Sequence, residues 1–118
     1  MLNKLLKLAA ISYAALASSP SFAVYSCEGL VTFLGIEKSG NVIVALGGST
    51  SFHTICNQVN QGSFGIVPQS CKSAYGALLA GKTLGKSMRI YYDDNGYTCN
   101  TIPSWSTVNT VYLVEGPL

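Results

Sequence analysis

The sequence predicts a small α+β domain that is mainly β, with five or six strands, one helix and two disulfides. Three observations support this fold class. The chain has 118 residues, of which 48% are hydrophobic and 10% charged, which suits one compact domain and excludes a multidomain enzyme, a charged disordered tail and a coiled coil. Short apolar runs bounded by turn residues indicate strands, and one segment has helical periodicity. Four cysteines follow an N-terminal export signal.

Residues 1–23 have the three parts of a secretory signal peptide. Two lysines precede an apolar run over Leu8–Ala17, and a small-x-small cleavage site ends at Ala23. The apolar run is shorter than the roughly 20 residues that a membrane-spanning helix requires. We therefore expect a periplasmic or secreted protein with no membrane span and a single domain at residues 24–118. A buried N-terminal helix is the alternative.

The predicted mature domain carries no net charge. Residues 24–118 contain five basic and five acidic side chains, so the net charge of +2 belongs entirely to the signal peptide. Because nucleic-acid binding depends on Lys and Arg that neutralise phosphates, we expect no nucleic-acid partner. Lys82, Lys86 and Arg89 form a local basic cluster, which we interpret as a solvated helix end.

All four cysteines lie in the predicted mature domain. An even number in a small exported chain predicts two disulfides, and the absence of a C-x-x-C pair argues against a zinc or redox site. We favour Cys56–Cys71 and Cys27–Cys99, although the sequence leaves the other two connectivities open. In the chain-entropy model, a loop of 15 residues contributes about 3 kcal/mol and one of 72 residues about 4.4 kcal/mol.

Cys27 has a second interpretation. The segment Val24–Cys27 resembles a lipoprotein processing site, in which Cys27 would become the lipidated N-terminal residue. Tyr25 fits that pattern poorly, and lipidation would leave one of the other three thiols without a partner.

The first half of the domain predicts three strands. Leu30–Ile36 and Val42–Leu46 are apolar runs separated by the turn-forming segment Lys38–Asn41, which predicts a hairpin. Ser51–Cys56 alternates well enough for a third strand. Asn57–Gln69 is polar, contains glycine and lacks periodicity, so we expect a loop.

The next segment changes to a helical period. Apolar residues recur at helical spacing over Cys71–Ala80, and Ser70 can act as the N-cap. We expect the helix to end at Gly81 or Gly85. Gly76 lies inside the helix, where glycine costs about 1 kcal/mol relative to alanine. We therefore expect it to pack closely against the sheet.

The last part of the chain predicts three more strands. Ser87–Tyr92 has strand alternation, and the turn Asp93–Gly96 contains Asn-Gly, which is typical of a hairpin. Tyr97–Thr101 is the expected returning strand. Thr107–Val114 is expected to be the final strand and to close the sheet.

The sequence offers few groups for catalysis. His53 is the only histidine, and it lies mid-strand without a nucleophile motif nearby, so we interpret it as a half-buried or surface strand residue. Asp93 and Asp94 are adjacent acids in a turn, which are usually solvated. The cysteines are assigned to disulfides, so too few metal ligands remain. We expect no enzyme activity, no catalytic residue, no metal and no cofactor. A small hydrolase using His53 or the two aspartates is the alternative.

Aromatic and polar residues gather near the C-terminus. Aromatic faces beside hydroxyl, amide and carboxylate groups suit sugar rings, whose C–H faces stack while their hydroxyls need directional partners. We interpret Tyr92 as a core residue. The candidate binding residues are therefore Tyr97 and Trp105, with Asp94 and Asn95 as polar partners.

One stretch resembles a known family. Cys71–Ala80 (CKSAYGALLA), followed by Gly85–Ile90 (GKSMRI), is similar to a helix, a Gly-Lys turn and a strand in the B subunits of subtilase-type bacterial toxins. The resemblance covers about 20 residues strongly, and the rest of the domain shares only the order of elements. It implies a small antiparallel OB-like barrel, a ring-forming oligomer and binding of cell-surface glycans. It transfers no sugar-contact residue to a position in this chain.

These observations predict a non-enzymatic, exported binding module, which the resemblance extends to a toxin-B-like, glycan-binding subunit. The runs VIVAL and TVYLV are apolar on both strand faces and therefore favour a homo-oligomer. The alternative is a structural or inhibitory protein that contacts a protein partner through its edge strands or the 57–69 loop.

Overall fold

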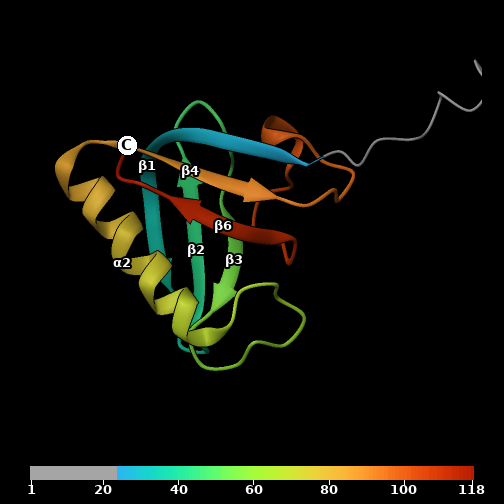
Figure 1. Cartoon of the computed structure of the whole chain (residues 1–118). Coiled ribbons are helices and arrows are strands. Elements are labelled where there is room, and N and C mark those ends of the chain that lie inside the picture. The colour runs from blue at the N-terminus through green and yellow to red at the C-terminus, as the bar shows by residue number, and fades with distance from the viewer. Residues whose placement is uncertain (1–23) are drawn as a thin grey trace, which may run out of the picture.

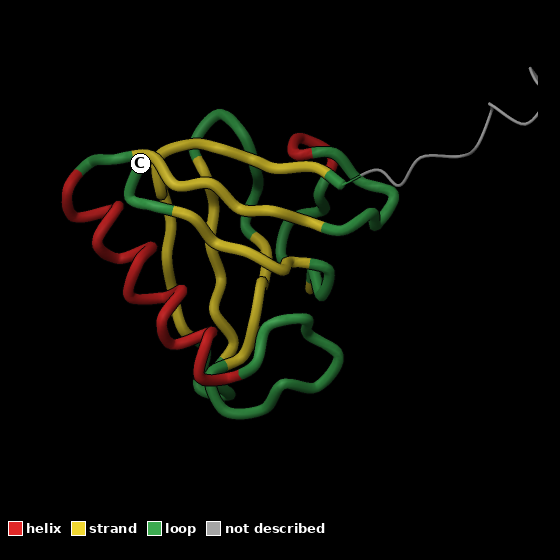
Figure 2. Tube along the Cα trace, viewed as in Figure 1, coloured by secondary structure: helices red, strands yellow, loops and turns green. Residues whose placement is uncertain are grey.

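The computed structural model describes residues 24–118, and the predicted signal peptide at residues 1–23 lies outside the described part. One twisted sheet and one long helix make up the domain (Figures 1 and 2). The elements in chain order are β1 (Tyr25–Ile36), β2 (Asn41–Leu46), β3 (His53–Asn57), α2 (Pro68–Leu84), β4 (Ser87–Tyr92), the 3-10 helix η1 (Cys99–Thr101), β5 (Ser106–Thr107) and β6 (Val111–Glu115). The prediction of a mainly β domain with one helix is confirmed.

The six strands form a sheet in the order β5-β3-β2-β1-β4-β6. β1 is long and curved, so that its two halves pair with different neighbours. Residues 25–30 pair with β4, and residues 31–36 pair with β2, both antiparallel. The sequence predicted only the second half of β1, because Gly29 and the polar residues around it interrupt the apolar pattern.

The expected antiparallel barrel is wrong in two respects. The sheet does not close, and the β3–β5 pair is parallel. The predicted final strand, Thr107–Val114, is divided by a turn into β5 and β6. Val108 still donates its backbone N–H to Thr54 O of β3, whereas Thr110 O already accepts from Asp93 N after β4. Between Val108 and Thr110 the chain passes from β3 to β4, so the ladder of backbone hydrogen bonds is interrupted between β5 and β6.

The predicted hairpin after β4 is also wrong. β4 has β1 on one edge and β6 on the other, so no edge remains for Tyr97–Thr101. The end of that segment forms η1 instead, and Thr98 and Thr101 cap it reciprocally. Gly96 has a positive φ of 78°, but Asn95 does not share it, so the turn is not the two-residue type that Asn-Gly suggested.

The helix begins earlier than predicted, whereas its C-terminal end agrees with the prediction. Val67 is the N-cap and Pro68 the first helical residue, rather than Ser70. Proline suits this position because its missing N–H would have no helical partner there. Gly85 ends the helix with φ 64°, and the following N–H of Lys86 bonds to Gly81 O at 2.9 Å. Gly85 was one of the two predicted ends.

Gly76 does not pack against the sheet. It is exposed, and a Cβ added to it would meet nothing within 4 Å. The glycine in close contact is Gly81, where a Cβ would lie 2.6 Å from Met88 Sδ. The sequence pattern identified a helix with glycines but not which of its faces met the sheet.

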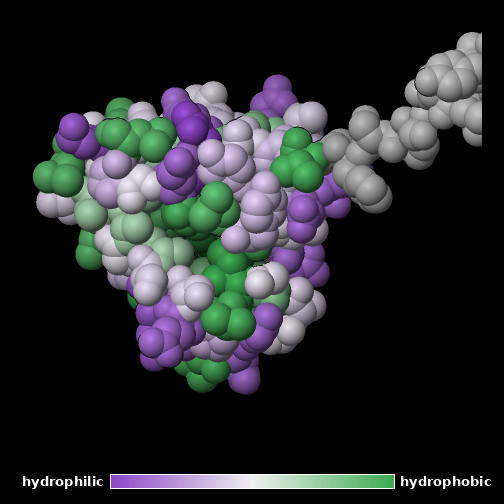
Figure 3. All heavy atoms as spheres, in the orientation of Figure 1, coloured by the Kyte–Doolittle hydropathy of each residue, from purple (hydrophilic) through white to green (hydrophobic). Residues whose placement is uncertain are grey.

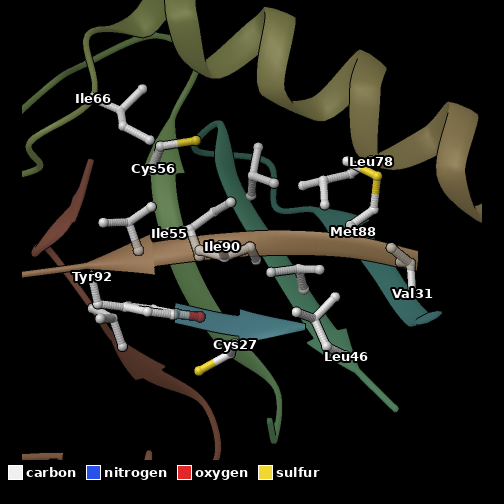
Figure 4. Close-up of a cluster of buried hydrophobic side chains, with 14 of the residues drawn as sticks. Cys27, Val31, Leu46, Ile55, Cys56, Ile66, Leu78, Met88, Ile90 and Tyr92 are labelled. Carbon is white, nitrogen blue, oxygen red and sulfur yellow. The ribbon is translucent and has the colours of Figure 1, made fainter. Parts of the chain in front are cut away.

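The core lies between the curved sheet and α2 (Figure 4). Leu78 of α2 meets Met88 of β4 on one side, and Tyr92 lies near Cys27 at the other end of the cluster. Every residue of Val42–Leu46 is buried within this single chain. The apolar VIVAL run therefore needs no second copy to cover it, which removes one of the two reasons for expecting an oligomer.

Both favoured disulfides are confirmed. Cys27–Cys99 joins β1 to η1, and Cys56–Cys71 joins β3 to α2, with Cα–Cα distances of 5.6 and 5.7 Å. Because the Cys27 sulfur is in a disulfide and β1 begins before it, at Tyr25, the lipoprotein interpretation of Cys27 is wrong.

Candidate binding site

An exposed tryptophan stands beside the start of β3. The parallel pairing of β3 with β5 sets His53 opposite Ser106. The residues before these two, Phe52 and Trp105, are therefore neighbours, and Trp105 N donates to Phe52 O at 2.7 Å. The fold thus places a C-terminal aromatic residue against one that lies far from it in the sequence.

Three aromatic rings form one cluster there, which we call the Trp105 platform: Phe33, Phe52 and Trp105. The Trp105 ring stacks on Phe52 with centroids 5.0 Å apart and an interplanar angle of 6°. Phe33 meets both rings edge-on, at 4.8 Å from Phe52 and 6.1 Å from Trp105. Stacked and edge-to-face geometries are the favourable ones for aromatic pairs, so the two phenylalanines fix the indole from below and from the side.

Trp105 has an unfavourable backbone conformation in this position. It is 62% exposed, and its φ of 62° makes it the one non-glycine residue of 24–118 with a positive φ. A bulky residue in that region is a genuine outlier, and such strain clusters at binding and catalytic sites. The turn is fixed because Ser106 bonds to Pro103 O through both its backbone N–H and its hydroxyl.

Hydroxyl groups border the platform along the chain. Ser51 and Ser106 use their hydroxyls internally, on Ile102 O and Pro103 O. Ser104, next to Trp105, is exposed, and its hydroxyl makes no hydrogen bond to any residue of the described part of the chain. The platform therefore combines a flat apolar face with a hydroxyl open to a ligand.

Within residues 24–118, no hydrogen bond or ring contact joins Trp105 to the other three predicted binding residues. Asn95 uses its side chain within the protein, since Oδ1 accepts from Tyr25 Oη and Tyr97 N and Nδ2 donates to Thr110 Oγ1. Asp94 accepts from Gly96 N at 3.0 Å and shapes the turn. Tyr97 is 41% exposed, but no ring contact joins it to Trp105 within residues 24–118.

Phe33 and Phe52 are the members of the platform that the sequence analysis missed. Phe33 lies in β1 and Phe52 directly precedes β3, and the apolar pattern of these segments predicts burial. Only the pairing of distant segments brings the two rings against Trp105. No local signal in the sequence marks them.

His53 is fully buried, so the expectation of a half-buried or surface residue is wrong. Nδ1 lies 2.8 Å from Ser51 O, which can only accept, and Nε2 lies 2.7 Å from Tyr92 Oη. Nδ1 therefore carries the proton, and Tyr92 donates to Nε2. Burial lowers the pKa of His53, which the bond to Ser51 O partly opposes, and burial raises the pKa of Tyr92. This pair links β3 to β4 inside the core.

Arg89 does not belong to a solvated helix end, as the sequence analysis expected. It lies on β4 and forms ion pairs with Glu28 of β1 and Glu115 of β6, the second at 3.0 Å. Tyr91 also donates to Glu115 at 2.9 Å. Bonds to Tyr91 and Glu28 raise the pKa of Arg89. The charge of Arg89 is thus neutralised locally, whereas Lys82 lies in the last turn of α2, as expected for a helix end.

Residues 24–118 contain no group of three or more metal-ligating side chains that could hold an ion. None of their helices is long and apolar enough to span a bilayer. The chain matches no protein-family model, and neither a curated protein nor a solved structure with significant similarity was found.

Proposed function

We propose that this protein is an exported, non-enzymatic binding module that stacks a carbohydrate ring on the Trp105 platform. The observation that carries the proposal is the strained, exposed position of Trp105 on Phe52. The indole is not a member of the buried core cluster of residues 24–118, and yet the fold keeps it in an unfavourable backbone conformation. A ligand that covers the ring is the simplest reason for that arrangement.

The chemistry of the platform favours a sugar. A flat aromatic face attracts the apolar C–H face of a pyranose, and the Ser104 hydroxyl can both donate to and accept from a sugar hydroxyl. Because Phe33 and Phe52 hold the indole in place, little side-chain freedom is lost on binding. Two disulfides support an oxidising location outside the cytoplasm, where surface glycans occur.

We include in the proposal an OB-like fold whose closing strand is interrupted. It is supported by the order of three strands, a helix and the remaining strands, and by the sharing of β1 between β2 and β4. In this interpretation, β5 and β6 are two pieces of one closing strand. An OB-like fold would account for the resemblance to toxin B subunits and supports a glycan partner in addition to the Trp105 platform. Ring formation is a separate expectation.

A glycan array tests the proposal. The oxidised protein is labelled and compared with Trp105→Ala and with Tyr112→Ala, which removes another exposed aromatic ring (45% exposed) away from the platform. We expect wild type and Tyr112→Ala to bind the same glycans and Trp105→Ala to bind none. Binding by Trp105→Ala at the wild-type level, or no glycan bound by wild type, would contradict the proposal.

A further inference from the structure

A groove lies beside the edge strand β6. It has a volume of about 440 Å³ and runs between α2 and β6. Figure 3 shows apolar residues gathered around a hollow on this face of the molecule. The groove is lined by Ile66, Ser70, Ser73, Ala74, Ala77, Tyr112, Leu113 and Val114.

β6 brings a free strand edge to this groove. It pairs with β4 on one side only and is the last strand of the sheet. Within residues 24–118, no backbone group of Tyr112–Glu115 bonds to anything but β4. The other edge, β5, is only two residues long. A free edge has a repeating row of N–H and C=O groups that another extended chain can pair with.

β6 has few of the features that usually protect an edge, although its pairing with β4 skips Tyr112. It contains no lysine and no proline, and its one charged residue, Glu115, is paired with Arg89. Leu113 is 46% exposed, as an apolar residue on a free edge. Natural proteins normally cover or charge such a strand.

We propose that β6 binds an extended, uncharged segment of a partner protein, which adds to the sheet as a further strand and lies in the groove against α2. This surface is separate from the Trp105 platform, and the proposal does not depend on glycan binding. It gives the protein-partner alternative a definite location and includes Ile66 from the 57–69 loop.

The lining of the groove defines the segment. The helix side consists of serine and alanine, which leave room for the side chains of the added strand. No lining residue is charged, so a charged side chain would lose its hydration without gaining a partner. We therefore expect small or branched apolar residues at alternate positions, because alternate side chains of a strand point to the same face.

The dimensions favour a peptide segment over a second copy. β6 has five residues, a length of roughly 17 Å at strand spacing. Pairing two such edges would join only five residues of each copy, whereas a stable dimer buries at least roughly 1,200 Å². A single extended segment contacts both β6 and α2, because the groove encloses it from two sides.

Peptide selection tests this proposal. Random nonapeptides displayed on phage are selected on the oxidised protein, and the enriched sequences are synthesised and titrated by calorimetry. Two variants alter the site: Leu113→Lys charges the edge, and Ala74→Leu fills the groove. The matched control is Leu79→Lys, which changes a leucine of similar exposure (45%) on α2 outside the groove.

We expect uncharged peptides with alternating apolar residues to be enriched. Their affinity should fall by at least about tenfold in both site variants and change by less than about twofold in Leu79→Lys and Trp105→Ala. Bound peptide should slow hydrogen exchange at residues 112–114. Failure to enrich peptides, wild-type affinity in both site variants, or a dimer in light scattering that Leu113→Lys dissociates would overturn the proposal.

Discussion

Tyr92 donates its hydroxyl proton to Nε2 of His53 across 2.7 Å, in a part of the core where both residues are completely buried. His53 in turn donates from Nδ1 to Ser51 O. The arrangement favours the neutral imidazole, because burial disfavours the charged ring and a proton on Nε2 would force the Tyr92 hydroxyl to turn away. The pair therefore makes the stability of the fold sensitive to pH.

Stability should fall as the pH drops below about 6.5, the pKa of histidine in an unfolded chain. Since burial lowers the pKa of His53 in the folded state, the unfolded state binds the proton first. The contribution is complete above that pH and is lost below it, with a slope of up to about 1.4 kcal/mol per pH unit. Urea unfolding between pH 5 and 7.5 measures it. The variant His53→Gln should show a clearly smaller slope, and an unchanged slope would exclude His53 as the cause.

Tyr92→Phe should destabilise the protein by about 1–3 kcal/mol, because it leaves Nε2 of His53 buried without a partner. Tyr91→Phe is the matched control on the same strand, since its hydroxyl bonds to the exposed Glu115. It should change stability by less than about 0.5 kcal/mol. Chemical unfolding at pH 7.5 compares the two. Equal losses of stability in the two variants would show that the buried Tyr92–His53 bond contributes no more than the exposed Tyr91–Glu115 bond.

Local sequence signals predicted some elements better than others. β2 was predicted from a continuous apolar run, and β3, β4 and the helix from their periodicity. The favoured disulfides are the observed ones, although the sequence left the other connectivities open. The segment Tyr97–Thr101 has strand-like composition, but both edges of β4 are taken by strands from elsewhere in the chain. Edge occupancy depends on long-range pairing, which local propensity does not contain.

The candidate site illustrates the same limit. The sequence suggested Trp105 as a candidate binding residue from its type and surroundings, and the structure places it at 62% exposure. It could not identify Phe33 and Phe52 as its supports, because Phe52 reaches Trp105 through the parallel pairing of β3 with β5 and Phe33 comes from a third strand, β1. Asn95 was chosen for its chemistry, yet the fold uses that side chain to bind Tyr25, Tyr97 and Thr110.

Two glycines of α2 should respond in opposite directions to alanine. Gly76→Ala should stabilise the protein by about 0.5–1 kcal/mol, because the site is open and alanine favours the helix. Gly81→Ala should destabilise it by about 1–3 kcal/mol, because the new methyl would overlap buried Met88. Thermal unfolding of the two variants measures both effects. Stabilisation by Gly81→Ala would contradict the packing described between α2 and β4.

The two disulfides should contribute different amounts to the free energy of unfolding. Replacing Cys27 and Cys99 by alanine opens a loop of 72 residues, whereas replacing Cys56 and Cys71 opens one of 15. Loop entropy predicts losses of about 4.4 and about 3 kcal/mol. Unfolding curves of the two double variants test this order. A larger loss for the short loop would show that packing of the buried Cys56–Cys71 pair, rather than loop entropy, sets the difference.

The central claim is that the Trp105 platform contacts a glycan, and the intrinsic fluorescence of the protein tests it most directly. Trp105 is the only tryptophan in the chain, so its emission reports on the platform alone. The best glycan from the array is titrated into the wild-type protein while calorimetry measures binding independently. The account predicts a saturable change in emission with the same midpoint as the heat. Binding heat with unchanged emission would contradict it.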